Sequence, residues 1–294
     1  MRLNDRFQWG ARTYVMGILN VTPDSFSGDG LGGTAAGTVD RTVEQAREFL
    51  AAGADILDIG GESTRPGATP LTVAEELARV LPAIAAVAGE FPGATISIDT
   101  FKAEVAAAAL DAGAHMINDI WGLRADPALG PLAAARGAPV ILMHNRSRPS
   151  ELIVDRLGGS YLGAEYGHLI DDVGREMAAL AEAALAAGIP RDQIILDPGI
   201  GFGKTIAQNM ALINHMHRFR DLGYPLLSGP SRKSFIGRVL DVPADERVEG
   251  TAAAVALSIV RGADIVRVHD VRVMTRIARM MDAMLRTTPD GAGA

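Results

Sequence analysis

Acceptor-rich side chains stand at the ends of several short apolar runs in the sequence. Asp99, Asn118 and Asp197 each close such a run. Their carboxylate and amide oxygens accept hydrogen bonds, so together they suit a flat ligand that presents several N–H donors. A cap or a turn could account for any one of them. Because several runs end in such a residue, the pattern indicates that these residues share one site.

Basic side chains follow two further runs near the C-terminal end of the chain. Arg232 and Lys233 come after one run, and Arg267 and His269 come at the end of the next. Arginine and lysine are common partners of phosphate groups in proteins. The two groups of residues together predict a ligand with a nitrogen-rich end and an anionic end.

Eight segments share one plan, in which a short apolar run leads to a polar residue. These segments are residues 14–20, 51–61, 94–99, 111–120, 135–144, 186–199, 221–230 and 260–270. Uniformly apolar strands with helices between them are typical of a parallel sheet that is covered on its faces. Eight such units predict a closed (β/α)8 TIM barrel and a single domain over residues 1–294. An open, doubly wound sheet is the structural alternative.

Helical patterns connect the predicted strands. They cover residues 38–52, 73–89, 102–113, 127–136, 164–188, 207–223, 249–262 and 271–285. In (β/α)8 barrels the active site lies at the carboxyl ends of the strands, and the loops after strands seven and eight commonly bind phosphate. The acceptor-rich and basic residues stand at those ends, so we expect them to meet on one rim.

Three segments carry no periodic apolar pattern. Residues 22–38 are rich in glycine and follow Asn20 at the end of the first run. We expect a lid over a site whose floor is Asn20, with a surface omega loop as the alternative. We expect a second long loop over residues 149–168, and a disordered tail from about residue 287.

Composition limits the classes of function. The net charge of −7 argues against a general nucleic-acid binder. The absence of cysteine excludes disulfides, thiolate zinc sites and a cysteine nucleophile. The sequence shows no apolar signal core and no run of about 18 apolar residues. We therefore expect a cytoplasmic protein without a membrane partner.

Two further signals are weaker. The stretch GIGFGKT at 199–205 resembles a phosphate-binding P-loop, but that motif needs glycine where this chain has Pro198. His144 ends the fifth run without an obvious ligand partner, so we expect it to have a structural or loop-orienting role.

Seven motifs follow one another along the predicted barrel. They are GILNVTPDSFS (17–27), DIGGESTRPGA (58–68), SIDT (97–100), NDI (118–120), LDPGIGFGKT (196–205), SGPSRKSFIG (228–237) and RVHDV (267–271). In this order they resemble the dihydropteroate synthase family of pterin-binding barrels, from about residue 14 to residue 285. One departure is Gly28-Asp29, where the family commonly has aspartate before glycine. The lid carboxylate is thereby shifted by one position.

The resemblance implies a reaction in folate synthesis. In that reaction 6-hydroxymethyl-7,8-dihydropterin diphosphate and p-aminobenzoate give 7,8-dihydropteroate and pyrophosphate, with Mg²⁺ as cofactor. The resemblance also implies a homodimer. By motif, the pterin would be held by Asp99, Asn118 and Asp197.

The other roles that the resemblance implies belong to the anionic end, the second substrate and the lid. Arg267 and His269 would grip the diphosphate, Asn20 would ligate Mg²⁺, and Lys233 would touch the pterin near p-aminobenzoate. The catalytic group would be Asp99, Lys233, Arg267 and His269. The p-aminobenzoate and lid region would be lined by Thr64, Arg65, Pro66, Phe202 and Ser234, with Asp24, Ser27 and Asp29 in the lid.

Two other interpretations stay open from the sequence. Pterin-binding barrels also occur in methyltransferases, but a methyl donor has no diphosphate for the SRK segment at 231–233 to bind. A barrel that binds pterin without catalysis would need a broken motif. The shift at Gly28-Asp29 is the one departure of that kind that we find.

Overall fold

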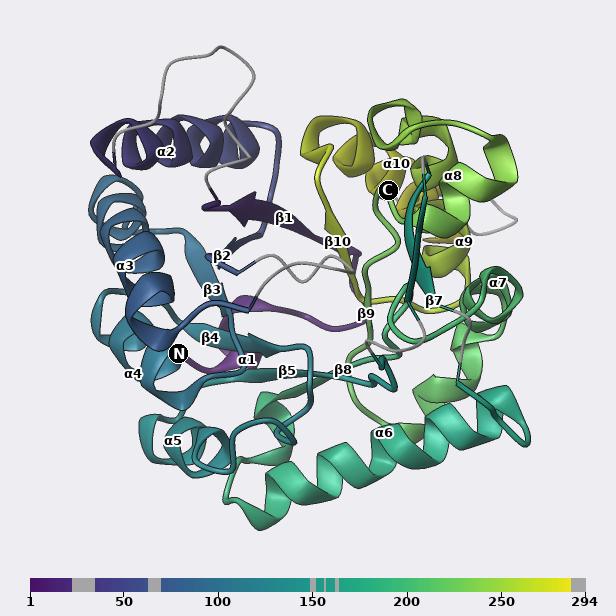
Figure 1. Cartoon of the computed structure of the whole chain (residues 1–294), viewed down its shortest axis with the longest axis horizontal. Coiled ribbons are helices and arrows are strands. Elements are labelled where there is room, and N and C mark those ends of the chain that lie inside the picture. Colours follow the sequence, from purple (N-terminus) through teal and green to yellow (C-terminus); the bar gives the residue numbers. More distant parts are fainter. Residues whose placement is uncertain (23–34, 63–69, 149–151, 156, 162–163, 287–294) are drawn as a thin grey trace.

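The computed structural model describes residues 1–22, 35–62, 70–148, 152–155, 157–161 and 164–286. Its main sheet has eight parallel strands in the order β8-β5-β4-β3-β2-β1-β10-β9 (Figure 1). A bridge between Leu196 in β8 and Leu226, just before β9, links the two ends of the sheet. The strands are β1 (Tyr14–Asn20), β2 (Ile56–Gly60), β3 (Thr95–Asp99), β4 (Met116–Asp119), β5 (Val140–Met143), β8 (Ile194–Asp197), β9 (Leu227–Ser228) and β10 (Ile265–Val268). The predicted barrel is confirmed, and the open sheet is wrong.

Helices surround the barrel, and their apolar faces pack against the outer side chains of the strands (Figure 1). They are α2 (Ala35–Ala51), α3 (Val73–Glu90), α4 (Ala103–Asp111), α5 (Leu129–Arg136), α6 (Leu169–Ala186), α7 (Ile206–Asn214), α8 (Ser234–Leu240), α9 (Val248–Val260) and α10 (Val271–Arg286). None of the helices in the described ranges is long and apolar enough to cross a lipid bilayer.

The helix α8 was not predicted, and two helix boundaries differ most from the prediction. The helix expected from residue 164 begins at Leu169, because the Asp172 carboxylate accepts hydrogen bonds from the backbone N–H groups of Gly167 and His168. These bonds hold the preceding residues in a turn. The helix expected over 207–223 ends at Asn214 and continues as a 3₁₀ helix, η4 (Met216–Leu222), which Gly223 ends in the left-handed conformation.

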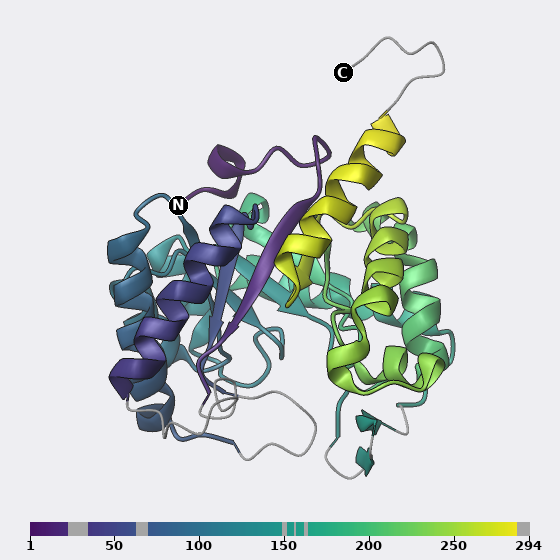
Figure 2. The ribbon, with the colours of Figure 1, turned by 90° about the horizontal axis from the view of Figure 1, so that it is seen from above.

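The inside of the barrel is closed at one end by the short helix α1 (Leu3–Arg6), which the sequence did not predict. Leu3 and Phe7 pack against the inward side chains of the strands. That inner layer consists of Tyr14, Met16, Ile56, Met116, Ile141, Ile195, Leu227 and Ile265. Figure 2 shows α1 on the opposite side of the molecule from the hairpin β6–β7. A ligand must therefore enter at the carboxyl ends of the strands.

The segment 149–168 holds secondary structure that we did not expect. Within it β6 (Leu152–Asp155) and β7 (Gly158–Tyr161) pair as an antiparallel hairpin. The Arg247 guanidinium donates to the Leu157 carbonyl over 2.9 Å and ties the turn of the hairpin to the start of α9. The segment predicted as a long loop therefore contains a hairpin, which the sequence reasoning did not identify.

Several expected features lie outside the described residues. They are the lid residues Asp24, Ser27 and Asp29, the p-aminobenzoate residues Thr64, Arg65 and Pro66, and the tail 287–294.

Candidate active site

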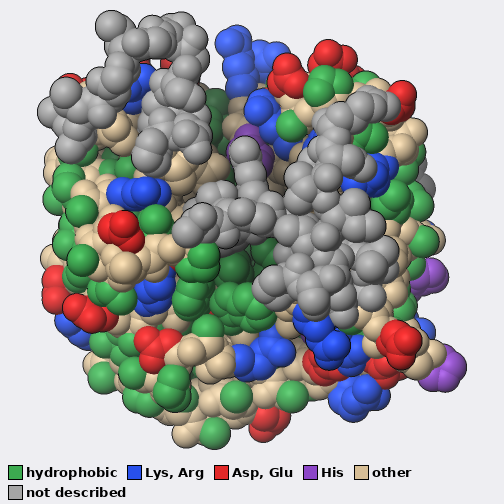
Figure 3. All heavy atoms as spheres, in the orientation of Figure 1, with side chains coloured by type: hydrophobic (Ala, Val, Ile, Leu, Met, Phe, Trp, Pro, Cys, Tyr) green, Lys and Arg blue, Asp and Glu red, His purple; other side chains and the backbone are tan. Residues whose placement is uncertain are grey.

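The pleat of the strands aims the polar strand ends at the barrel axis. Alternate residues of a strand point to the same side of the sheet. Ile56 belongs to the inner layer, so Asp58, two residues later, also points inward. By the same spacing, Asp197 points inward after Ile195, and Arg267 after Ile265. Figure 3 shows a hollow on this face, with a histidine and basic side chains along one edge and apolar side chains deeper in.

A buried polar cluster forms the floor of this hollow. The Arg267 Nε donates to Asp58 Oδ2, and the Arg267 Nη2 donates to Asp99 Oδ2, both over 2.6 Å. The Asn118 amide nitrogen donates to the same Asp58 Oδ2 over 3.0 Å. The structure thus brings together Asp99, Asn118 and Arg267, as expected, around Asp58.

Asp58 stands at one of the polar strand ends that the sequence predicted for the rim, but the sequence reasoning gave it no specific role. Its side chain is fully buried, and its Oδ1 finds no hydrogen-bond partner among the described residues. Its spacing of two residues from the inward-facing Ile56 indicates that its side chain points into the barrel. Gly60 follows at the same spacing, and a Cβ there would lie 3.2 Å from the Cβ of Asp99, so glycine leaves room for that carboxylate.

Burial shifts the protonation of this floor. It raises the pKa of Asp99 to about 7; the positive charge of Arg267 opposes this shift, and the negative charge of Asp58 adds to it. For Arg267, burial works against the charged form, but Asp58 and Asp99 outweigh it and raise the pKa of the guanidinium. The cluster therefore holds one firmly charged cation and a carboxyl group, Asp99, that titrates near neutrality.

Asp197 and Lys233 occupy the neighbouring part of the rim. The Asp197 Oδ1 accepts a hydrogen bond from the Gly199 N–H over 2.7 Å, so this carboxylate also braces the turn that follows β8. Burial raises the pKa of Asp197, while the positive charge of Lys233 opposes the shift. Burial also lowers the pKa of Lys233 to about 7.

The Lys233 ammonium group lies against the loop between β8 and α7. It donates to the Ile200 carbonyl and sits 4.4 Å from the centre of the Phe202 ring. Lys233 is the N-cap of α8, and Ser234 is the first residue of that helix. The structure therefore places the Lys233 side chain beside Phe202, and Ser234 follows Lys233 in the chain.

His269 and Arg232 stand on the basic side of the rim. The buried Ser231 hydroxyl accepts from the backbone N–H of His269 over 3.1 Å and lies 3.0 Å from its ring Nδ1, which orients the imidazole. The Arg232 Nε donates a hydrogen bond to Asp270 Oδ2 over 2.9 Å. The basic residues predicted for the anionic end thus all have partners within the protein, Arg232 with Asp270, Arg267 with Asp58 and Asp99, and His269 with Ser231.

A second ionic cluster borders the site beside β2 and was also missed. The Lys102 ammonium group donates to the Glu62 carboxylate, and to Glu76 Oε2 over 2.6 Å. Glu76, in α3, is almost completely buried. The cluster ties the carboxyl end of β2 to α3 and to the start of α4.

Asn20, the expected Mg²⁺ ligand, ends β1 beside Gly60 of β2 and is half-buried. The described ranges contain no group of three or more His, Cys, Asp or Glu side chains that could hold a metal ion. One amide oxygen at the rim suits Mg²⁺, which is commonly bound through few protein ligands together with water and phosphate oxygens. The residues present thus fit a metal that is shared with a phosphate ligand.

The fold and the site together define a pterin-binding enzyme of the (β/α)8 class. Residues 16–269 match the family model described as "Pterin binding enzyme". The chain is 48% identical to the dihydropteroate synthase of Bacillus subtilis (strain 168), over 93% of this chain and 89% of the relative.

Solved structures agree with this match. The dihydropteroate synthase of Xanthomonas albilineans with 4-aminobenzoic acid superposes with a TM-score of 0.85 at 41% identity, over 94% of each chain. The same enzyme with 7,8-dihydropteroate gives a TM-score of 0.83 at 37% identity, over 97% of this chain and 98% of that one. The chain therefore belongs to the dihydropteroate synthase family, whose members are transferases of folate biosynthesis. These relatives favour a synthase over the methyltransferase and the non-catalytic barrel.

Proposed function

We propose that this chain condenses 6-hydroxymethyl-7,8-dihydropterin diphosphate with p-aminobenzoate, releasing 7,8-dihydropteroate and pyrophosphate. The observation that carries the proposal is the buried cluster of Asp58, Asp99, Asn118 and Arg267 at the open end of the barrel. It offers hydrogen-bond acceptors to a nitrogen-rich ring beside a cationic rim. The structures of a relative with 4-aminobenzoic acid and with 7,8-dihydropteroate support p-aminobenzoate as a substrate and 7,8-dihydropteroate as the product.

The pterin end is assigned to the three acceptors. Asp99, Asn118 and Asp197 would receive hydrogen bonds from the N–H edge of the pterin. Arg267 keeps Asp99 fixed in position. Because the site is buried, a donor or acceptor that a wrong ligand leaves unpaired costs about 1–3 kcal/mol. Selectivity for the pterin edge follows from this cost.

The reaction breaks the bond between the pterin methylene carbon and the diphosphate oxygen. Pyrophosphate leaves with the bonding electron pair, and the pterin ring shares the positive charge that develops on the carbon. The amine of p-aminobenzoate then forms the new C–N bond and loses one proton. Arg267 and His269 would stabilise the leaving group, and Asp99 the cationic pterin. This sequence of steps needs no nucleophilic side chain.

The second substrate is assigned to the other side of the rim. Lys233 would lie near p-aminobenzoate, with Phe202 and Ser234 along its pocket, because the Lys233 side chain lies beside Phe202 and Ser234 follows it at the start of α8. Thr64, Arg65 and Pro66 would complete that pocket, with Asp24, Ser27 and Asp29 in the lid.

Mg²⁺ is proposed as the cofactor, with the Asn20 amide oxygen as its protein ligand. When bound beside the diphosphate, the ion would neutralise charge that develops on the leaving group. Asn20 ends β1, next in the sheet to β10, which carries Arg267. This arrangement would place the anion between Asn20 and the basic side chains.

We also propose a homodimer formed through the outer helices. Apolar side chains are exposed on helices that pack against one another, among them Met210 of α7, Leu257 and Val260 of α9, and Val273 and Met280 of α10. The only charged residue within α9 is Glu249. Exposed apolar faces of this kind are typical of subunit interfaces. We also propose that the protein is located in the cytoplasm.

Product formation tests the reaction. The purified chain should convert the two substrates with Mg²⁺ to dihydropteroate and equimolar pyrophosphate, both measured by chromatography. Pterin binding without product would identify a non-catalytic barrel. Methyl transfer from methyltetrahydrofolate in place of condensation would identify a methyltransferase.

A further inference from the structure

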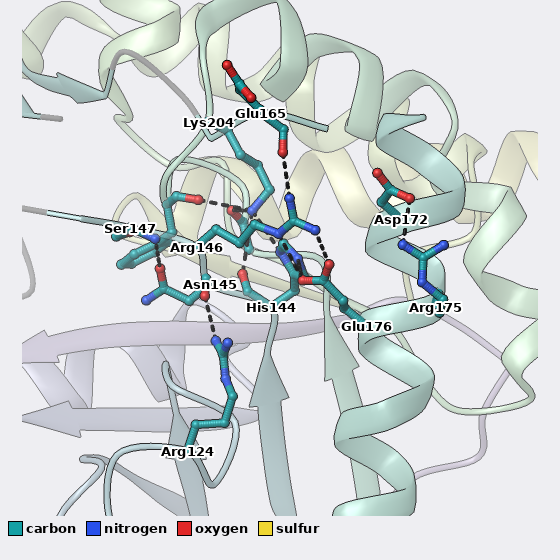
Figure 4. A network of polar contacts seen from close by, with 12 residues as sticks. Arg124, His144, Asn145, Arg146, Ser147, Glu165, Asp172, Arg175, Glu176 and Lys204 are labelled. Carbon is teal, nitrogen blue, oxygen red and sulfur yellow. Dashed lines mark hydrogen bonds and ion pairs between the residues drawn. The ribbon is translucent and has the colours of Figure 1, made fainter. Parts of the chain in front are cut away.

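A buried ionic network lies beneath the loop that joins β8 to α7 (Figure 4). Lys204 is only 2% exposed. Its ammonium nitrogen lies 3.1 Å from His144 Nδ1, 2.9 Å from the Gly199 carbonyl and 3.0 Å from the Phe202 carbonyl. In its protonated form the Lys204 amine has three N–H donors, and these three acceptors satisfy all of them. Lys204 therefore points into its own loop, which excludes the P-loop role that GIGFGKT suggests.

The protonation of His144 follows from its two neighbours. Its Nε2 lies 2.9 Å from Glu176 Oε2, and its Nδ1 faces the Lys204 ammonium group. Burial lowers the pKa of His144 to about 3, and the positive charge of Lys204 adds to this effect. The neutral ring thus donates from Nε2 to Glu176 and accepts at Nδ1 from Lys204. Arg146 also donates to Glu176, with 3.0 Å between Nε and Oε2.

The loop is held between this network and the candidate active site. On the side of the network, Lys204 donates to the carbonyls of Gly199 and Phe202. On the side of the candidate active site, Lys233 donates to the carbonyl of Ile200, which lies between those two residues in the sequence. The packing is close on both sides. A Cβ at position 199 would lie 1.8 Å from the His144 carbonyl oxygen, and a Cβ at position 201 would lie 2.4 Å from Lys233 Cδ.

We propose that Lys204 is a positioning residue for the p-aminobenzoate half of the site. Its buried ammonium group fixes the Ile200 carbonyl and the Phe202 ring, and these set the place of the Lys233 ammonium group. Lys204 touches neither substrate. The role in catalysis rests on the proposed function, because that function is what places Lys233 and Phe202 at p-aminobenzoate.

Other side chains cannot replace this ammonium group. Methionine fills a similar volume but leaves the two carbonyls and His144 Nδ1 without a donor. Arginine carries its donors in a flat fork, which does not match three acceptors grouped around one nitrogen. A merely structural role would lower stability and affect both substrates equally, whereas a positioning role acts on one substrate.

Lysine resonances test the geometry without any assay of activity. The chain contains three lysines, Lys102, Lys204 and Lys233. Enzyme labelled with ¹³C at lysine Cε should therefore give three side-chain signals. In Lys204→Met one signal disappears. At a pH well below 7, where Lys233 is protonated in both proteins, we expect the Lys233 signal to move, because Lys233 loses its fixed place beside the Phe202 ring. Lys102 is bound to Glu62 and Glu76 beside β2, so its signal is the internal control.

Kinetics test the consequence for catalysis. Lys204→Met should raise the KM for p-aminobenzoate roughly tenfold or more, with affinity for hydroxymethylpterin changed by less than about threefold; tenfold in affinity corresponds to about 1.4 kcal/mol. The matched control is Thr205→Ala, which removes the capping box of α7 but none of the three acceptors. It should lower the melting temperature and leave both KM values unchanged.

Restoring the charge completes the test. Because the chain has no cysteine, Lys204→Cys can be alkylated with 2-bromoethylamine at one thiol in denaturant and then refolded. The new side chain carries an ammonium group at lysine length, and we expect it to restore the KM for p-aminobenzoate. Wild type taken through the same treatment is the control.

The outcomes separate the proposal from the function on which it rests. An unmoved Lys233 signal in folded Lys204→Met, equal loss for both substrates, or no recovery after alkylation would each overturn the positioning role. Wild-type enzyme that forms no dihydropteroate would overturn the proposed function, while a moved Lys233 signal would still establish that Lys204 positions the loop.

Discussion

Arg267 and Asp99 are bonded to each other across the mouth of the barrel, with 2.6 Å between Nη2 and Oδ2 and 168 residues between them in the sequence. The sequence assigned Arg267 to the diphosphate and Asp99 to the pterin, as if they were separate halves of the rim. The bond joins the two halves. A change at the anionic end must therefore reach the pterin end.

Arg267→Lys tests this coupling. Lysine keeps the positive charge but cannot make both bonds of the guanidinium fork, which leaves Asp58 or Asp99 without its partner. Charge-assisted hydrogen bonds contribute roughly 1.5–3 kcal/mol each, so we expect roughly tenfold weaker binding of hydroxymethylpterin, in addition to weaker binding of the diphosphate. Calorimetry with both ligands measures this. Arg232→Lys, whose native partner is Asp270, is the control. Weakening confined to the diphosphate would show that Asp99 holds its position without Arg267.

Asp197 combines a ligand role with a turn role, and two substitutions separate them. Asp197→Asn keeps an oxygen that can accept from the Gly199 N–H, whereas Asp197→Ala loses the bond that braces the turn. Both should weaken hydroxymethylpterin roughly tenfold or more, because a buried N–H donor left unpaired costs about 1–3 kcal/mol. Only the alanine variant should also unfold at a lower temperature. If the asparagine variant binds pterin normally, Asp197 serves the turn alone.

The sequence was enough to predict the barrel and most of its rim, since both follow from local patterns. The strands are buried runs, and several follow a glycine that ends the preceding helix. Gly137 after α5 and Gly223 after η4, for example, adopt the left-handed conformation that such caps require. The strand ends then had to meet on one rim, which placed Asp99, Asn118 and Arg267 together.

The parts that were missed depend on contacts between distant segments. The bond from Arg267 to Asp58 spans 209 residues, and the bond from Lys204 to His144 spans 60. No local pattern reveals either pairing. His144 was expected to have a structural or loop-orienting role, but its partners Glu176 and Lys204 were not identifiable from the sequence. The hairpin β6–β7 was missed for a different reason. Its strands pair locally, across a tight turn, but the second strand, GGSY, carries no apolar pattern that predicts a strand.

The buried lysines should make stability depend on pH. Burial lowers the pKa of Lys204 to about 7 from its usual 10.5, so between those values the unfolded chain binds one more proton than the folded chain. The free energy of unfolding must then rise with pH through that window, by at most about 1.4 kcal/mol per pH unit for each such group. Below the folded pKa the burial penalty is complete and no longer changes with pH.

Urea titrations of wild type and Lys204→Met at several pH values check this sign. The variant should show a smaller rise in unfolding free energy across the window. A rise should remain, because Lys233 also has a pKa that burial lowers to about 7. Equal slopes in the two proteins would contradict the shifted pKa of Lys204.

Asn20→Ala tests the assigned metal ligand. The variant loses an amide oxygen at the end of β1, so pyrophosphate should bind more weakly in the presence of Mg²⁺. Without Mg²⁺ the two proteins should bind pyrophosphate equally, since the basic side chains are unchanged. Calorimetry with and without the ion measures the difference. Equal loss under both conditions would assign Asn20 to the anion or to the fold.

The exposed apolar face of α9 supplies the last prediction. Leu257 and Val260 are 37% and 47% exposed, although both are aliphatic. In a homodimer with twofold symmetry both subunits contribute the same patch to the interface, so one substitution in the sequence changes the interface at two positions. Val260→Glu would bring two carboxylates into one apolar contact and should convert dimer to monomer in sedimentation experiments. Val239→Glu on α8, at a position 57% exposed, is the matched control and should leave the mass unchanged. A wild-type chain that sediments as a monomer, or a Val260→Glu variant that stays dimeric, would remove α9 from the interface.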